Sequence, residues 1–152
     1  MQSDTMLIRE AAREDLAAVL SLYAHLHDAD EKAGDRVLER ICLEIPADPR
    51  THLFILEYEG APVATCVLHI HSNLTRGARP YGLIENVVTH REYRNRGFGT
   101  TLLTHAPGYA WERNCYKVML LTGRSEPNVF RLYEKAGFLR GVKEGLIAYP
   151  PE

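Results

Sequence analysis

The segment spanning residues 81–121 limits the folds open to this chain more than any other part of the sequence. A strand-like run over residues 81–89 is followed by a helix-like run over 97–114 and by a β-branched and aliphatic run over 116–121. A helix that joins two strands in this way makes them parallel neighbours in one sheet. The chain is therefore predicted to contain a βαβ unit, with the rest of the fold built around it.

The remaining elements are predicted to extend this sheet and to cover it. Apolar residues recurring at i, i+3, i+4 and i+7 predict a helix over residues 13–27, and a similar stripe predicts a second one over 34–44. Another helix is predicted over 127–136, ended by Gly137. The other predicted strands are residues 6–9, 52–58, 63–71, 138–141 and 145–149.

The connections indicate how these elements are joined. The sequence EGAP predicts a hairpin turn, and residues 72–80 form a polar, turn-rich loop that we expect to contribute substrate contacts. Pro107 and Gly108 interrupt the long helical run, so that helix is predicted to kink or split there. Hairpins on either side of the βαβ unit imply antiparallel pairs. The predicted fold is thus α+β, a three-layer α/β arrangement in which helices cover both faces of a mixed, mostly antiparallel sheet.

Length and charge limit the class of protein. At 152 residues the chain has the size of one domain, which we expect to span residues 1–152. Its formal net charge of −2 provides no global attraction to nucleic acid or to an anionic membrane, so neither is expected as a partner. Any anion must be bound by a local cluster. The sequence shows no apolar leader-like stretch and no apolar run of membrane-spanning length, which favours a cytoplasmic protein.

The cysteines and histidines form no metal-binding or disulfide pattern. Cys42, Cys66 and Cys115 are widely spaced and form no CxxC pair, so they are predicted to be reduced and mostly buried thiols. His69 and His71 alternate on a predicted strand and share one face, but no third ligand lies at a useful spacing. No metal site is predicted.

The sequence RNRGFG, residues 94–99, opens the long helix in an unusual way. Glycine is a poor helix former, so helix propensity alone does not explain Gly97 and Gly99. The first N–H groups of a helix lack intrahelical partners, and glycine lets an anion approach them without a Cβ in the way. Arg91, Arg94 and Arg96 add positive charge there. These features predict a pyrophosphate site, the alternative being a tight strand-to-helix turn that binds nothing.

Two motifs in this sequence resemble those of the GNAT family of N-acetyltransferases. RNRGFG matches every fixed position of the family signature [RQ]-x-x-G-x-[GA]. NVFRLYEKAGF, residues 128–138, resembles the family's segment in which an asparagine opens a helix and a tyrosine precedes the ending xKxGF. IREAAREDLAAVLSLY near the N-terminus is also similar, so the resemblance spans almost the whole chain. It implies the GNAT fold, with acetyl-CoA as the acetyl-donating cofactor.

The resemblance also implies where the cofactor binds. Its pyrophosphate would lie on the backbone amides of residues 95–100, and the strand over 87–89 would splay from the strand over 116–121 to bind the pantetheine arm. Asn128 would bond the pantetheine, and Tyr133 would stand near the thioester sulfur. The predicted cofactor-binding residues are Val87, Val88, Thr89, Arg94, Asn95, Arg96, Gly97, Phe98, Gly99, Thr100, Asn128 and Tyr133.

Acetyl transfer to an amine requires a proton acceptor for the amine and a proton donor for the departing thiolate. A phenol with a pKa of about 10 suits the donor role, and the motif around Tyr133 favours that role over a tyrosine that only packs in the core. Glu85 is predicted to be the base, because burial in an apolar strand would make its carboxylate a better proton acceptor. An equal alternative is a carboxylate that binds a cationic amine or faces an open edge. A backbone N–H within residues 87–89 would bind the developing oxyanion.

The predicted activity is acetyl transfer from acetyl-CoA to a primary amine of a small molecule or peptide. Direct attack in a ternary complex is favoured, because no cysteine lies in either motif. IENVV, residues 84–88, resembles IEDIVV of the glucosamine-phosphate acetyltransferase branch, which supports an amino-sugar acceptor. The alternative function is a non-catalytic acyl-CoA-binding or sensing module on the same scaffold. A homodimer is also expected, since dimers are common among similar proteins.

Overall fold

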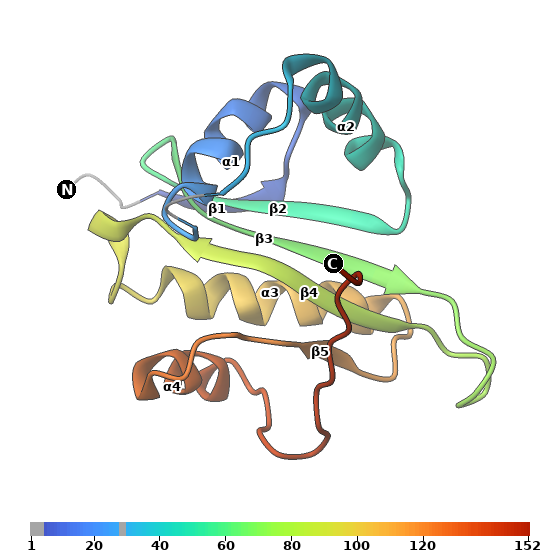
Figure 1. The fold of residues 1–152 in the computed structure, drawn as a ribbon. Helices are drawn as coiled ribbons and strands as arrows, with labels where there is room; N and C mark the ends of the chain where they lie inside the picture. Colours follow the sequence, from blue (N-terminus) through green and yellow to red (C-terminus); the bar gives the residue numbers. More distant parts are fainter. Residues whose placement is uncertain (1–4, 28–29) are drawn as a thin grey trace.

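The structure, a computed structural model, describes residues 5–27 and 30–152 and contains one five-stranded sheet flanked by helices (Figure 1). The strands are β1 (Met6–Glu10), β2 (Thr51–Tyr58), β3 (Ala61–His71), β4 (Tyr81–Thr89) and β5 (Val118–Leu120). The helices are α1 (Leu16–Tyr23), α2 (Asp35–Ala47), α3 (Phe98–Glu112) and α4 (Pro127–Lys135), with short 3-10 turns at Arg13–Asp15 and Arg91–Tyr93. The strands lie side by side in chain order. All neighbouring pairs are antiparallel except β4–β5, which is parallel, so the predicted mixed and mostly antiparallel sheet is confirmed.

Helices cover both faces of the sheet, as expected. On one face Leu16 and Val19 of α1 pack against Leu53, Ile55 and Val67 of β2 and β3, and α2 lies beside them. On the other face α3 packs against the sheet, with α4 next to it. The buried core on the α3 face includes Phe54, Leu56, Leu68, Ile84, Leu102 and Leu103. Because successive residues of a strand point to opposite faces, each central strand contributes to both cores.

The turns follow from local chemistry. β2 ends at Tyr58 and β3 begins at Ala61, so Glu59 and Gly60 form the hairpin loop, with φ values of 52° and 80°. Two loop residues with positive φ are typical of a type I′ turn, whose twist matches that of the flanking strands. The predicted EGAP turn is therefore confirmed. Gly137, with a φ of 94°, follows the last turn of α4 and ends it as predicted.

α3 is a single continuous helix, so of the predicted kink or split at Pro107 the split is wrong, and the kink stays a prediction. Pro107 has no N–H to donate to the carbonyl of Leu103, which removes one bond from the helical ladder. Its ring is nevertheless buried, as are Ala106 and Ala110 on the same helix. Packing of this apolar side against the sheet stabilises the helix despite the missing hydrogen bond.

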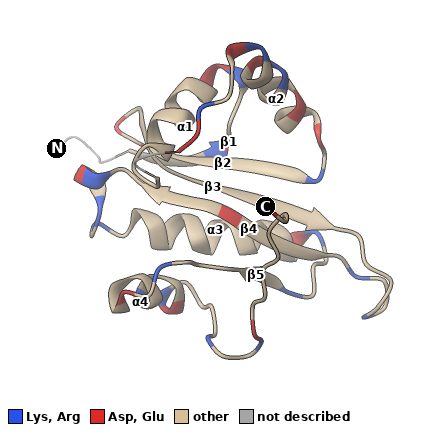
Figure 2. Cartoon of the chain, viewed as in Figure 1, with Lys and Arg blue, Asp and Glu red and all other residues tan. Residues whose placement is uncertain are grey.

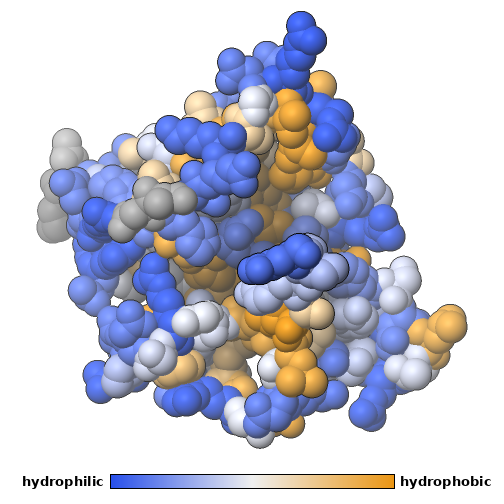
Figure 3. Space-filling view, viewed as in Figure 1, coloured by the Kyte–Doolittle hydropathy of each residue, from blue (hydrophilic) through white to orange (hydrophobic). Residues whose placement is uncertain are grey.

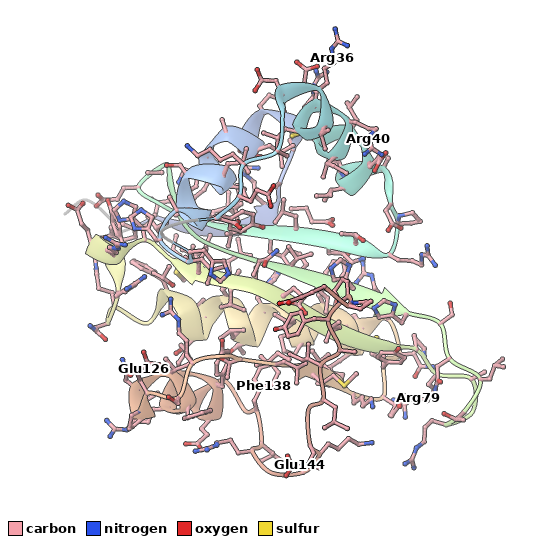
Figure 4. The ribbon with its side chains drawn as sticks, viewed as in Figure 1. Arg36, Arg40, Arg79, Glu126, Phe138 and Glu144 are labelled. Carbon is pink, nitrogen blue, oxygen red and sulfur yellow. The ribbon has the colours of Figure 1, made fainter. Side chains whose placement is uncertain are left out.

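The chain after α4 forms no strand within the described residues, so the strands predicted over 138–141 and 145–149 are wrong. This segment bends back toward the sheet, with Glu144 at the tip of the bend (Figure 4). Its exposed apolar side chains are Leu139, Val142, Leu146, Ile147 and Tyr149. β5 is also shorter than the predicted run over 116–121. An apolar segment forms a strand only where it can pair with the edge of a sheet. The three-residue β5 provides too short an edge for the chain after α4 to pair with.

The loop of residues 72–80 lies at the opposite end of β4 from the start of α3. It leads into the first residue of β4, whereas α3 follows the last residue of that strand. Arg79 in this loop donates hydrogen bonds to the carbonyl oxygens of Asn114 and Cys115, at 3.2 and 3.3 Å. Figure 4 shows Arg79 far from Glu126, which precedes α4. The loop is thus opposite the glycine-rich helix start along β4, and its expected substrate contacts stay a prediction.

No helix in the described part of the chain is long and apolar enough to cross a membrane. Those same residues include no group of three or more histidine, cysteine, aspartate or glutamate side chains placed to hold a metal ion.

Candidate active site

β4 and β5 part from each other partway along β4. Their parallel pairing runs from Gly82 and Val118 to Ile84 and Leu120 and then stops, although β4 continues to Thr89. Among the described strands, the end of β4 therefore has no partner on the β5 side. A cleft of ≈ 830 Å³ opens here, lined by residues of β4, the start of α3, the β5–α4 connection and α4. The structure thus shows the splaying that the sequence resemblance implies.

A β-bulge lies in the part of β4 that lines the cleft. The β3–β4 register shifts between Thr65 and Val67, so that one residue of β3 opposes two residues of β4, Asn86 and Val87. Asn86 has a φ of 52°, a region that asparagine enters more readily than most residues. Tyr23 of α1 lies close to the Asn86 side chain, which partly offsets the rise in the pKa of Tyr23 caused by burial. A bulge takes a residue out of the strand ladder, so backbone groups at this point can face a ligand.

The start of α3 supplies backbone donors to the same cleft. Gly97 precedes the helix with a φ of 84°, and Asn95 has a φ of 59°. Thr101 donates its N–H to the Gly97 carbonyl at 3.0 Å. The amides of residues 98–100 precede this bond and have no intrahelical acceptor, and they carry the positive end of the helix dipole. They line the cleft, where they can bind an anion.

Gly99 serves packing as well as anion access. A Cβ at this position would meet Leu132 Cδ1 of α4 at 3.2 Å and Thr89 Oγ1 at 3.4 Å. A larger side chain would therefore press on α4 and on β4. At Gly97 a Cβ would meet nothing within 4 Å, so the requirement there is the positive φ. Gly97 is thus required for its backbone conformation, and Gly99 is required for close packing.

Two arginines hold positive charge at the cleft. Arg94 donates to the carbonyl oxygens of Thr89 and His25 at 3.2 Å each, and Arg124 donates to the Leu26 carbonyl at 3.5 Å. Desolvation lowers the pKa of Arg94, and the charges of nearby arginines lower it further. Figure 2 shows basic positions in the turn between β4 and α3. Positive groups this close together favour a bound anion. Through their bonds to the carbonyls of His25 and Leu26, the two arginines also connect the chain after α1 to this site.

Arg96 lies apart from the cleft. Its guanidinium stacks over the rings of Tyr58, Phe98 and Tyr93, at 4.6, 5.1 and 5.4 Å from their centroids, and it is not among the cleft-lining residues. The cation–π contacts stabilise the local packing. The structure brings together all the other predicted site residues, which line the cleft: Glu85, Val87, Val88, Thr89, Arg94, Asn95, Gly97, Phe98, Gly99, Thr100, Asn128 and Tyr133.

Tyr133 is fixed in the cleft wall by α4. Its side chain lies close to Thr122, and its ring lies edge-on to Phe138 at 6.2 Å. Burial raises the pKa of Tyr133, and the nearby Thr122 side chain and the charge of Arg124 partly offset this effect. A phenol that stays protonated at neutral pH and has a fixed position can donate a proton to a leaving group.

Glu85 is exposed, so the burial on which its predicted role as a base relied is not found. It pairs with Val67 and therefore lies on the sheet face that α1 and α2 partly cover, at the edge of the cleft. An exposed carboxylate there can bind a cationic amine, and this favours the alternative role left open by the sequence.

Several residues of the site were not predicted from the sequence. Asn86 gave a usable signal, because asparagine is uncommon inside strands and tolerates positive φ. Tyr23 reaches it only because α1 packs on this part of the sheet. Thr122 and Arg124 lie in a connection without a motif, and only the fold shows that they reach the cleft.

Comparison with known proteins identifies the family. Residues 10–138 match the model of the acetyltransferase (GNAT) family. The chain is 31% identical over 131 residues to glucosamine 6-phosphate N-acetyltransferase of Trypanosoma brucei brucei, which covers 86% of this chain and 87% of that protein. A solved putative acetyltransferase from Agrobacterium tumefaciens str. C58 has a TM-score of 0.87 and 41% identity, covering 94% of this chain and 99% of that one. An aminoglycoside N-acetyltransferase solved with CoA shares the fold, with a TM-score of 0.79, 18% identity and coverage of 99% and 97%.

The chain belongs to the GNAT acetyltransferase family and is an acetyl-CoA-dependent N-acetyltransferase. The cleft fits this cofactor. Amides without intrahelical acceptors and the Arg94 guanidinium lie where a pyrophosphate can bind. The end of β4, which has no described partner on the β5 side, offers backbone groups to an extended arm.

We predict that Arg94→Ala weakens acetyl-CoA binding more than Arg96→Ala does. Loss of a charge-assisted contact should lower the affinity by about tenfold, and this loss should shrink at high salt, which screens exposed charges. Arg96→Ala should instead lower the melting temperature, because it removes the cation–π contacts on three rings. Isothermal titration calorimetry at two salt concentrations, with thermal melts, measures both effects. Equal and salt-independent affinity losses in the two variants would contradict the assignment.

Proposed function

We propose that this protein transfers the acetyl group of acetyl-CoA to a primary amine of a small molecule, and that its acceptor is an amino sugar. The observation that carries the proposal is the cleft, in which the end of β4 that lacks a partner on the β5 side, the start of α3 and Tyr133 meet beside Glu85. Its volume is that of a small-molecule site. The Trypanosoma brucei relative, named a glucosamine 6-phosphate N-acetyltransferase, supports the amino-sugar class.

Acetyl-CoA supplies the acetyl group as a thioester, and residues of the cleft supply the remaining chemistry. The amides of residues 98–100 and Arg94 bind the pyrophosphate. A backbone N–H of residues 87–89 donates to the carbonyl oxygen as negative charge develops on it. Glu85 faces the acceptor amine. As the amine nitrogen bonds to the carbonyl carbon and the carbon–sulfur bond breaks, Tyr133 donates its proton to the sulfur. In the same proposal the Asn128 side chain bonds the pantetheine.

The cysteines support direct attack by the amine over transfer through an acyl-enzyme. Cys66 is fully buried, and burial raises its pKa to about 12, so it is a neutral thiol near pH 7. Cys42 and Cys115 are free thiols outside the cleft lining. Because all three cysteines are free, we also propose a reducing, cytoplasmic location, which cell fractionation would test.

We further propose that the protein is a homodimer. β5 is the last strand in the sheet order, so its outer edge lacks a described strand partner. The segment after α4 exposes apolar side chains, and Figure 3 shows apolar surface around the end of this segment. Apolar patches beside an open strand edge are typical of subunit interfaces. Light scattering should give a mass near twice the 17.2 kDa of the chain, and a monomer mass at working concentrations would overturn this proposal.

We predict that glucosamine 6-phosphate accelerates thiol release from acetyl-CoA by the purified protein. Glucose 6-phosphate is the matched control, because it has a hydroxyl in place of the amine. It should give only the background rate. A panel of free glucosamine, an aminoglycoside and a short peptide would define the acceptor class. Activity confined to the peptide would overturn the amino-sugar proposal. Binding of acetyl-CoA without turnover on any amine would overturn the enzyme and favour a non-catalytic acyl-CoA-binding module.

We predict that Tyr133→Phe lowers kcat and kcat/KM together, by about 10²–10⁴-fold, while acetyl-CoA affinity holds. The change keeps the ring that packs on Phe138 and removes only the proton donor. Tyr109→Phe is the control, since Tyr109 packs on His52 and Phe54 outside the cleft. Steady-state kinetics with the best amine, alongside calorimetry, gives both quantities. A near-normal kcat in Tyr133→Phe would leave water as the donor.

A further inference from the structure

Three side chains form a hydrogen-bonded series on the sheet face that α1 and α2 partly cover. Thr51 Oγ1 donates to Asp48 Oδ2 at 2.8 Å, and the same hydroxyl lies 3.3 Å from His69 Nδ1. Thr51 and His69 are partners in the β2–β3 pairing, so the contact joins neighbouring strands. The backbone N–H of Arg50 also donates to Asp48 Oδ1, at 2.9 Å. Neither of the two family-like motifs contains these residues.

The series fixes where the proton lies on the His69 ring. Hydrogen bonds from the Arg50 N–H and the Thr51 hydroxyl lower the pKa of Asp48, so this side chain is an ionised group that only accepts. Thr51 has one hydroxyl hydrogen and gives it to Asp48, so toward His69 its oxygen can only accept. Nδ1 of His69 therefore carries the hydrogen. In the neutral ring, Nε2 keeps a lone pair that can take up a proton.

His69 is a near neighbour of Glu85. Val67 pairs with Glu85, and His69 lies two residues further along β3 on the same face. Such diagonal neighbours across antiparallel strands lie about 7–8 Å apart, within reach of long side chains. An ammonium that donates to both side chains spans two hydrogen bonds of about 2.9 Å each, which fits between them. Glu85 lines the cleft whereas His69 does not, so an ammonium between them would lie at the edge of the proposed acetyl-transfer site.

The groups that face His69 keep its ring neutral near pH 7. Burial lowers the pKa of His69, and the adjacent His71 and, on β2, His52 lower it further. Glu85 on β4 and Asp48 before β2 act in the opposite sense, and the net shift is downward. An ordinary histidine titrates at about pH 6.5. His69 is thus neutral at pH 7 and gains a proton only in more acidic solution.

We infer that His69 accepts the proton of the acceptor amine, that Thr51 and Asp48 hold its ring in the required tautomer, and that Glu85 binds the ammonium. This inference rests on the proposed function and names the group within it that removes the proton. It makes His69 a catalytic residue, with Thr51 and Asp48 as positioning residues.

The proton and electron balance is complete. One N–H bond of the ammonium breaks, its proton moves to Nε2 of His69, and the freed lone pair forms the bond to the carbonyl carbon. Tyr133 protonates the departing sulfur, and the second proton that the nitrogen loses restores Tyr133. His69 then releases its proton to solvent. While charged, the imidazolium is stabilised by the carboxylates of Glu85 and, through Thr51, Asp48.

The test compares His69→Gln with His71→Gln. His71 lies on the same strand and face, with its ring 6.1 Å from that of His69, and it is exposed. His69→Gln should lower kcat by about 10²–10⁴-fold without changing acetyl-CoA affinity, whereas His71→Gln should act nearly as the wild type. Added imidazole should restore part of the activity of His69→Ala. Glu85→Gln should chiefly raise the KM of the amine.

A pH profile separates a proton acceptor from a residue that only supports the fold. With one amine used throughout, its own titration cancels in the ratio of wild-type to His69→Gln kcat/KM. This ratio should be large and constant above the pKa of His69 and should fall as pH drops through it, because the protonated ring cannot act as a base. A ratio that stays constant across this range would assign His69 a structural role.

Thr51 gives an independent test of the same series. Thr51→Val keeps the β-branched shape but removes the acceptor for Nδ1–H, so kcat should fall and the acid limb of the profile should move. Thr51→Ser keeps the hydroxyl and should restore both. His69 and His71 variants with the same kinetics, or Thr51→Val and Thr51→Ser with the same profile, would overturn the inference. A wild-type protein that acetylates no amine would overturn the proposed function itself and the inference with it.

Discussion

The early end of the β4–β5 pairing is the constraint on which the rest of this structure depends. The two strands share only the register from Gly82 to Ile84, and β4 then continues without β5. Backbone N–H and C=O groups that leave a sheet need other partners, because unpaired ones are unfavourable away from water. The bulge at Asn86, which lies beside Tyr23, disrupts the ladder on the β3 side of the same segment. An extended ligand can therefore take the place of the missing strand, and the fold presents a binding edge without a separate binding domain.

The helix start completes the site because β4 leads almost directly into α3. Gly97 allows the chain to turn with positive φ, and Gly99 allows α4 and β4 to approach the helix closely. The same geometry directs the first amides of α3 into the cleft, so the local requirements of folding and the requirement of anion access coincide. This coincidence explains why a motif of a few residues predicts both the local fold and the anion site.

The sequence predicted those elements that are determined by residues close together along the chain. The hairpin at Glu59 and Gly60, the βαβ unit and the glycine-rich helix start all follow from short patterns, and the structure has them. The strands expected after Phe138 do not form, because strand formation depends on a partner edge that no local pattern describes. Arg96 belongs to the motif yet stacks on aromatic rings, since its direction is decided by Tyr58, which comes from a distant strand. Glu85 is exposed although its strand neighbours are apolar, because the packing around β4 decides its burial and its apolar neighbours do not.

The two halves of the site differ in how the chain encodes them. The cofactor half is built mainly from one stretch, the end of β4 and the start of α3, with α4 closing it. The acceptor half, in the proposed interpretation, depends on Asp48, Thr51, His69 and Glu85, which three separate segments bring to one sheet face. Substitutions on these strands can change the acceptor side while the anion-binding helix start keeps its geometry. Such an arrangement lets one acetyl-donor site serve different amines. It also explains why sequence motifs predict the acetyl donor, whereas the acceptor has to be inferred from the fold.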